Sequence, residues 1–245
     1  MNSKPSNVEN EAVAGRPWAM RMVWRDLAFL HWAFDPQELR PLLPRGVELD
    51  TFEGRAWVGV VPFFMRGVRA HWTPPLPGLS AFPEINLRTY VTAGGRSGVW
   101  FFSLDVTSRP AVWVARTTFH LPYFRAAMRA ESEGEGVRYE HRRDQPGAPE
   151  AAFAARYRPK GPVFESEPGT LEDFLTNRLC LFAARPDGRI VCGEVRHDPW
   201  PLQSAEVELE RNDMFGQVGL DMPSGPPLAH FARELDVLAW TVRAL

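Results

Sequence analysis

The chain has 245 residues, of which 44% are hydrophobic and 24% charged, so it can build a packed core and does not have the composition of a disordered protein. Its net charge of -2 creates no field that would attract nucleic acid or an anionic membrane. No apolar run reaches the roughly 18 to 20 residues that a membrane-spanning helix needs. Residues 1–15 are polar and unlike a signal peptide, so they predict a disordered tail and a cytoplasmic protein.

Residues 16–245 are predicted to form one β-rich domain. A first strand is expected over residues 20–32, followed by a short helix with Asp35 as its N-cap and Pro36 at its first position. The apolar run 56–63 predicts another strand. The proline-rich segment 71–83 is expected to be a functional loop, since long irregular loops often carry function.

Turn residues divide the rest of the chain into hairpins and short helices. Strands at 85–92 and 99–106 flank Gly94-Gly95, which is the pattern of a β-hairpin. The remaining expectations are a strand or strand-to-helix unit at 109–121, a short helix at 122–128, an exposed strand at 137–141, a helix capped by Thr170, a second hairpin over 179–195, and strands at 205–210 and 235–242. Many short strands with few short helices predict an α+β fold dominated by antiparallel sheet.

Common catalytic motifs are missing from the sequence. It contains no phosphate-binding or dinucleotide-binding glycine pattern and no Gly-x-Ser-x-Gly, which argues against nucleotide-dependent and serine-hydrolase activity. The histidines lack metal-binding spacing, so neither a metal nor another cofactor is predicted. Cys180 and Cys192 flank a hairpin turn and are interpreted as buried free thiols, with a disulfide as the less favoured alternative.

Four polar residues, Glu84, Asn86, Arg88 and Tyr90, alternate with mostly apolar ones. In a strand this spacing of two places them on one face. That face is turned either toward water or toward a polar cavity, and the pattern alone does not decide between these alternatives.

Two further groups are candidates for a site. Arg116, Thr118 and His120 share one face of a predicted strand ahead of Pro122, although a single histidine is more often structural. Arg25 interrupts an apolar strand, where exposure is the default. If Arg25 is buried it needs a carboxylate partner, and Glu84 is a candidate.

Four segments in order resemble the YqjF-like family of uncharacterised bacterial proteins, within the acetoacetate decarboxylase-like superfamily. The segments are DPQELRPLLP at 35–44, GLSAFPEINLRTY at 78–90, FHLPY at 119–123 and DPWPLQ at 198–203. The resemblance covers residues 20–242 and implies a cone-shaped antiparallel β-barrel with short flanking helices and an interior pocket.

The resemblance also gives positions in the decarboxylase site. The active-site arginine of that enzyme corresponds to Arg25, its carboxylate to Glu84, and its nucleophilic lysine to Tyr123. A Schiff base requires a primary amine, which tyrosine lacks. The two lysines, Lys4 and Lys160, lie outside the motif, so the chain is not expected to perform this decarboxylation.

These inferences predict an interior pocket that binds a small carbonyl- or carboxylate-bearing molecule, and they leave open whether it also transforms that molecule by acid–base chemistry of a lyase, hydrolase or isomerase type, without a Schiff base. The candidate catalytic residues are His120, Tyr123 and Glu84, and the candidate binding residues are Arg25, Arg88, Asn86, Tyr90 and Arg116. A non-catalytic sensor or carrier and an interaction scaffold are the alternatives. The expected partner is a small organic ligand rather than nucleic acid or membrane, and homo-oligomer formation is left open.

Overall fold

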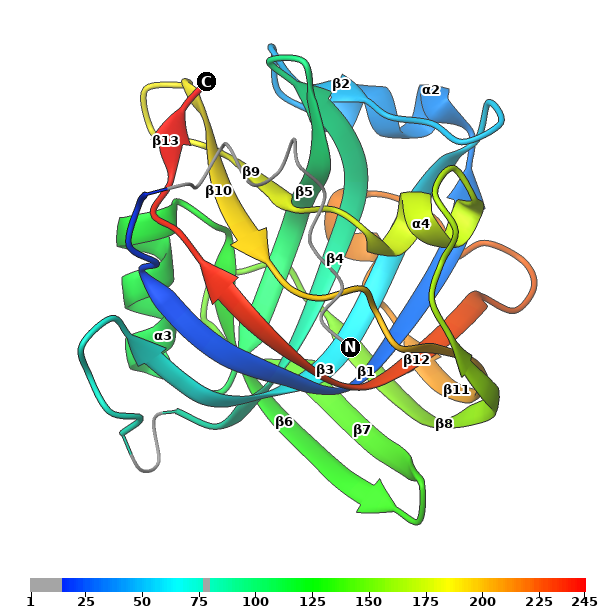
Figure 1. Ribbon diagram of the computed structural model, residues 1–245. Coiled ribbons are helices and arrows are strands. Elements are labelled where there is room, and N and C mark those ends of the chain that lie inside the picture. The colour runs from blue at the N-terminus through cyan, green and yellow to red at the C-terminus, as the bar shows by residue number, and fades with distance from the viewer. Residues whose placement is uncertain (1–14, 77–79) are drawn as a thin grey trace.

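The computed structural model describes residues 15–76 and 80–245, so the predicted tail, apart from Gly15, lies outside the described residues. Thirteen strands of the described ranges join into one sheet with short helices at its margins (Figure 1). The strands are β1 Met20–Phe34, β2 Glu48–Leu49, β3 Ala56–Ala70, β4 Phe82–Ala93, β5 Arg96–Val106, β6 Tyr123–Glu133, β7 Gly136–Arg143, β8 Ala152–Phe164, β9 Cys180–Ala184, β10 Ile190–Arg196, β11 Leu202–Asn212, β12 Leu228–Ala239 and β13 Arg243–Ala244.

The helices are short. They are α2 Pro36–Leu39, α3 Arg109–Val114 and α4 Leu171–Thr176, with 3-10 turns at Arg40–Leu42 and Gly216–Val218 and a π-helical turn at Ala115–Phe119. None of the helices in the described ranges has the length and apolarity needed to cross a membrane. Nearly all strand pairs are antiparallel, which confirms the predicted α+β class.

The sheet closes on itself twice because β5 and β12 change neighbours along their length. β5 lies beside β4, but its early residues Val99 and Trp100 pair with β9, whereas Leu104 to Val106 pair with β6. β12 lies beside β1 and pairs first with β11 and then with β10. A smaller barrel-like ring therefore contains β1, β3, β4, β5, β9, β10 and β12, and a larger one replaces β9 and β10 with β6, β7, β8 and β11.

The five strands β12, β1, β3, β4 and β5 form a wall that both rings share (Figure 1). Because side chains alternate along a strand, each wall strand presents one face to each ring. On β4, Ile85 and Leu87 are buried in the apolar core of the larger ring. Glu84, Asn86 and Arg88 point the other way, into the smaller ring.

A bulge changes this alternation on β1. Asp26 has a φ of 51°, and the pairing of β1 with β3 shifts register between Arg25 and Leu30. As a result Trp24 before the bulge and Leu27 after it both face the smaller ring. The bulge turns Arg25 away from that ring.

Local sequence signals predicted several elements correctly. Asp35 caps α2 by accepting a hydrogen bond from the Gln37 amide at 2.8 Å, and Glu38 completes a capping box. Thr170 caps α4 as predicted. The two predicted hairpins are β4–β5 and β9–β10, and Cys180 and Cys192 are buried and free.

Other predictions of local structure were wrong. The segment 122–128 does not form the predicted helix, because strand β6 begins at Tyr123 and pairs with both β5 and β7. The strand predicted at 137–141 exists as β7, but it is not an exposed strand, because Val137 and Tyr139 are buried in the apolar core and His141 is buried beside Asp105. Residues 109–119 are helical, so Arg116, Thr118 and His120 do not share the face that a strand would give them.

Candidate functional site

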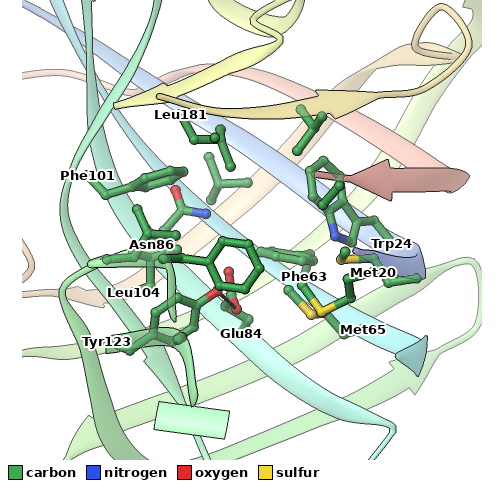
Figure 2. A pocket seen from close by; sticks show the side chains of 18 of the residues that line it. Met20, Trp24, Phe63, Met65, Glu84, Asn86, Phe101, Leu104, Tyr123 and Leu181 are labelled. Atoms are coloured by element: carbon green, nitrogen blue, oxygen red, sulfur yellow. Dashed lines mark hydrogen bonds between the residues drawn. The ribbon is translucent and has the colours of Figure 1, made fainter. Parts of the chain in front are cut away.

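A cavity of about 300 Å³ lies within the smaller ring. Its walls are mostly apolar, with Met20 and Trp24 from β1 and Phe63 and Met65 from β3 (Figure 2). Residues on one side of α3 also line it. Four of the polar residues that line the cavity form one strip. This strip consists of Glu84, Asn86 and Arg88 on β4 together with Tyr123 at the start of β6.

Glu84 and Tyr123 form a hydrogen-bonded pair at one end of the strip. The Tyr123 hydroxyl donates to Glu84 Oε2 at 2.9 Å (Figure 2). Burial raises the pKa of Glu84 to about 8; the Tyr123 hydrogen bond opposes this rise, and the charge of Asp105 adds to it. Burial, together with the Glu84 carboxyl, also raises the pKa of Tyr123 well above its usual value. Both groups therefore carry their protons at neutral pH.

Asn86 occupies the middle of the strip. Only 4% of the residue is exposed, yet its Oδ1 atom has no hydrogen-bond partner in the described residues. The amide extends into the cavity beside Phe101 and Leu104 (Figure 2). A buried polar atom without a partner is costly, and such atoms often mark a site that a ligand completes.

Arg88 lies at the other end of the strip. Its Nη2 donates to the Leu175 carbonyl at 3.0 Å, and its guanidinium lies 5.5 Å from the centre of the Phe29 ring. Its Nε is buried and has no partner in the described part of the chain. The guanidinium is always protonated, so Arg88 places a positive charge at the cavity.

Two other charged residues that line the cavity are neutralised by neighbours. Arg178 contacts Asp50 at 2.7 Å. Glu194 contacts Arg96 at 2.8 Å and Arg243 at 2.6 Å. Arg88 differs from Arg178 and Glu194, because within the described ranges it forms no ion pair with an oppositely charged side chain.

Tyr90 supports Arg88 rather than lining the cavity. The Tyr90 hydroxyl donates to the Leu175 carbonyl at 2.8 Å and lies 2.6 Å from His31 Nε2. Burial and the nearby Arg88 hold the pKa of His31 well below its usual range, so His31 is neutral. Gly59 makes room for this group, since a Cβ there would lie 3.0 Å from the His31 ring.

A second polar cluster lies behind Glu84, on the opposite face of β5. Asp105 is fully buried and accepts from Arg143 Nη2 at 2.7 Å, and it lies 2.7 Å from His141 Nε2. Arg143 also donates to Gln217 at 2.8 Å and lies over the Phe124 ring. Sequence reasoning missed this cluster because its members come from β5, β7 and a distant turn, with no local pattern joining them.

Besides Tyr90, three other residues proposed from the sequence lie outside the cavity. Arg25 forms an ion pair with Glu234 at 3.0 Å and borders a different cavity, so it does not pair with Glu84 as considered. His120 follows the π-helical turn with a φ of 56° and does not reach the cavity wall. Arg116 is exposed, and its Nε donates to the Tyr123 carbonyl at 2.6 Å. The expectation that Arg25 and His120 line the pocket is therefore corrected.

No lysine lines the cavity among the residues that the structure describes. Lys160 is in strand β8 rather than in a loop, and its ammonium contacts Glu206 at 3.1 Å on the surface. Lys4 lies outside the described residues. Nor do the described His, Cys, Asp and Glu residues form a group that could hold a metal ion.

Comparison with known proteins identifies the family. The family model DUF2071, described as an uncharacterised conserved protein, matches residues 21–236. The uncharacterised protein YqjF of Bacillus subtilis (strain 168) is 43% identical over 235 residues, which cover 96% of each chain.

Solved structures share the fold at low sequence identity. The enduracididine biosynthesis enzyme MppR complexed with pyruvate has a TM-score of 0.63 and 14% identity, covering 94% of this chain and 91% of that one. An acetoacetate decarboxylase-like enzyme from Sphingomonas wittichii RW1 has a TM-score of 0.60 and 16% identity, covering 94% and 95%. The chain therefore belongs to the DUF2071 family, together with YqjF, and has the fold of acetoacetate decarboxylase-like enzymes.

Proposed function

We propose that the cavity binds a small organic molecule bearing a carboxylate or carbonyl group. The observation that carries this proposal is the Arg88 guanidinium, which faces the cavity without a carboxylate partner in the described residues. A charge in such a position is normally paired, and a ligand carboxylate would pair it. Asn86 adds a polar group with an unmet hydrogen-bonding requirement. The solved complex of MppR with pyruvate is an example of a small oxo acid bound by this fold.

Glu84 is the group best suited to move a proton. Because its pKa is raised to about 8, it is a neutral acid at pH 7 and can donate a hydrogen bond or a proton to a ligand carbonyl. The Tyr123 hydroxyl, at 2.9 Å, would then stabilise the carboxylate that remains. His120, which the sequence suggested for proton transfer, has no place in this scheme because it does not line the cavity.

Any chemistry here is proposed to proceed without a Schiff base. Tyr123 occupies the position that the resemblance assigns to the decarboxylase lysine, and a phenol cannot form an imine. Lys160 is held on the surface by Glu206. We expect borohydride to trap no adduct between the protein and acetoacetate, and mass spectrometry of the digested protein would check this. A mass increase on Lys160 or Lys4 would overturn this part of the proposal.

A thermal-shift screen of small carboxylic acids and ketones tests the binding proposal. Ligands that occupy the cavity should raise the melting temperature of the wild-type protein. Arg88→Met should abolish the rise produced by carboxylates. Arg25→Met is the matched control, because Arg25 lies on the shared wall but outside the cavity.

The outcomes of this screen separate binding from the scaffold alternative. Carboxylates that stabilise the wild type and Arg25→Met but not Arg88→Met would support the proposal. No stabilisation by any acid, or an equal loss of stabilisation in both variants, would contradict it.

A measurement of turnover distinguishes an enzyme from a carrier or sensor. Loss of product formation in Glu84→Gln, with the thermal shift retained, would indicate an enzyme. A ligand recovered unchanged after long incubation favours the carrier.

A further inference from the structure

The polar strip has two ends that lie far apart. Glu84 and Arg88 are four residues apart on β4, and a strand rises about 3.3 Å per residue, which separates their Cα atoms by roughly 13 Å. The two side chains also have partners in different places. Glu84 meets Tyr123 of β6, whereas Arg88 meets Tyr90 and the Leu175 carbonyl of α4. A single carboxylate or ketone cannot contact both ends.

The stretch between the ends is lined by apolar groups on both sides of Asn86. Asn86 pairs across the sheet with Val61 of β3 and with Leu104 of β5, and both of these residues line the cavity. Phe101 and Phe63 face the same space (Figure 2). Apart from a group opposite Asn86, a ligand that reaches from one end to the other must therefore present a mostly apolar middle section.

Electrostatics determine which ligand group goes to which end. Arg88 supplies a positive charge and suits an anion. The end at Glu84 has the buried Asp105 carboxylate behind it, and Asp105 acts on Glu84 as a like charge. An anion placed beside Glu84 would meet that same repulsion, whereas a neutral carbonyl can accept a hydrogen bond from the protonated acid.

We infer that the ligand is a bifunctional organic acid, with a carboxylate bound by Arg88 and a carbonyl bound by Glu84, joined by an apolar spacer longer than the single methylene of acetoacetate. This inference rests on the proposed function and specifies its substrate class. Pyruvate and acetoacetate would reach only one end of the strip at a time.

A series of keto acids tests the required spacing. Isothermal titration calorimetry on the full-length protein would compare pyruvate, acetoacetate, levulinate, oxohexanoate and oxooctanoate, the last two with the ketone on the penultimate carbon. We expect affinity to rise along the series and to be greatest for an acid longer than levulinate. Each keto acid is compared with the plain fatty acid of the same chain length, which lacks the carbonyl.

The difference in affinity between a keto acid and the plain acid of the same length measures the contact at Glu84. For the best chain length the keto acid should bind roughly ten- to a hundredfold more tightly, as expected for one strong hydrogen bond in a buried site. Glu84→Met should close this gap, while Arg88→Met should weaken keto acid and plain acid alike. The comparison between ligands needs no variant, so it remains valid if a substitution impairs folding.

The results distinguish failure of this inference from failure of the proposed function. The inferred bifunctional ligand is wrong if acetoacetate binds as tightly as the longer keto acids, or if plain acids bind as tightly as keto acids at every length. In either case the proposed binding of a carboxylate by Arg88 would still hold. If no acid in either series binds, the proposed function itself is wrong.

Discussion

The shared wall has one face in a filled core and the other in a hollow, although both faces belong to the same strands. Toward the larger ring, Leu30, Ile85 and Leu87 are fully buried in a close-packed apolar core. Toward the smaller ring, Glu84 and Asn86 are also buried but border a cavity of about 300 Å³. Because side chains alternate along a strand, adjacent residues can contribute to stability on one face and to binding on the other.

Asp105 differs from the polar residues of the cavity in whether its side-chain atoms have partners. On the filled side Asp105 is buried, but Arg143 and His141 satisfy its oxygens. On the hollow side Asn86 Oδ1 and Arg88 Nε have no partner in the described residues. Interior polar groups are nearly always satisfied, so the unpartnered atoms of Asn86 and Arg88 beside a cavity indicate where a ligand belongs.

The largest effect should come from breaking the satisfied cluster. Asp105→Asn keeps the side-chain shape but leaves the buried Arg143 guanidinium without its carboxylate, which should cost about 3 to 5 kcal/mol of unfolding free energy. Urea unfolding followed by circular dichroism measures this loss. The matched control is Asp213→Asn, which breaks an exposed pair with Arg211 and should have a much smaller effect. Equal losses of unfolding free energy in the two variants would show that the Asp105 cluster does not act as a buried network.

Adjacent residues on β4 compare the two faces directly. Leu87→Ala empties space in the filled core and should cost about 2 to 5 kcal/mol. Asn86→Ala should cost clearly less, because the residue borders a hollow and its oxygen loses no hydrogen bond. Chemical unfolding of both variants makes the comparison. A loss for Asn86→Ala as large as that for Leu87→Ala would mean that the hollow face is packed.

The protonation of Glu84 should give the protein a distinct pH dependence. The pKa of Glu84 is raised from 4.5 to about 8 in the folded state, so its stabilising contribution is complete below pH 4.5 and is lost as the pH rises through about 8. Over this interval stability should fall by up to about 1.4 kcal/mol per pH unit. Glu84→Gln, which mimics the neutral acid, should remove this slope in unfolding curves recorded at several pH values. An unchanged slope would place the titration elsewhere.

The smallest effect concerns the hydroxyl of Tyr123. Its hydrogen bond to Glu84 lowers the pKa of that carboxyl and so opposes the rise caused by burial. Tyr123→Phe should therefore move the midpoint of the Glu84 titration to higher pH without abolishing it, as read from the same pH-dependent unfolding curves. A shift toward lower pH would contradict this assignment of the hydrogen bond.

Local patterns predicted the polar strip but not its surroundings. A spacing of two on a strand correctly grouped Glu84, Asn86 and Arg88, because strand geometry follows from the residue spacing. The same pattern gave no indication of whether this face met water or a cavity. That depends on β9 and β10, which lie far along the chain and close the smaller ring, and on α3, which lines one side of the cavity.

The wrong site predictions have structural causes that the sequence does not reveal. Strict alternation with Leu27 would place Arg25 in the cavity, but a bulge with Asp26 at φ 51° lies between them and Arg25 faces away from the cavity. The helical turns of residues 109–119 replaced the period of a strand, and this separated His120 from the group predicted with it. Asp105 and Arg143 meet only through long-range strand order, so no spacing rule could have joined them.

A crystal structure of the protein soaked with a medium-length keto acid would test the central claim most directly. We predict that the acid lies inside the smaller ring, with its carboxylate against Arg88 and no covalent bond to the protein. Density for the acid outside this ring, or continuous density joining it to a lysine, would contradict the account.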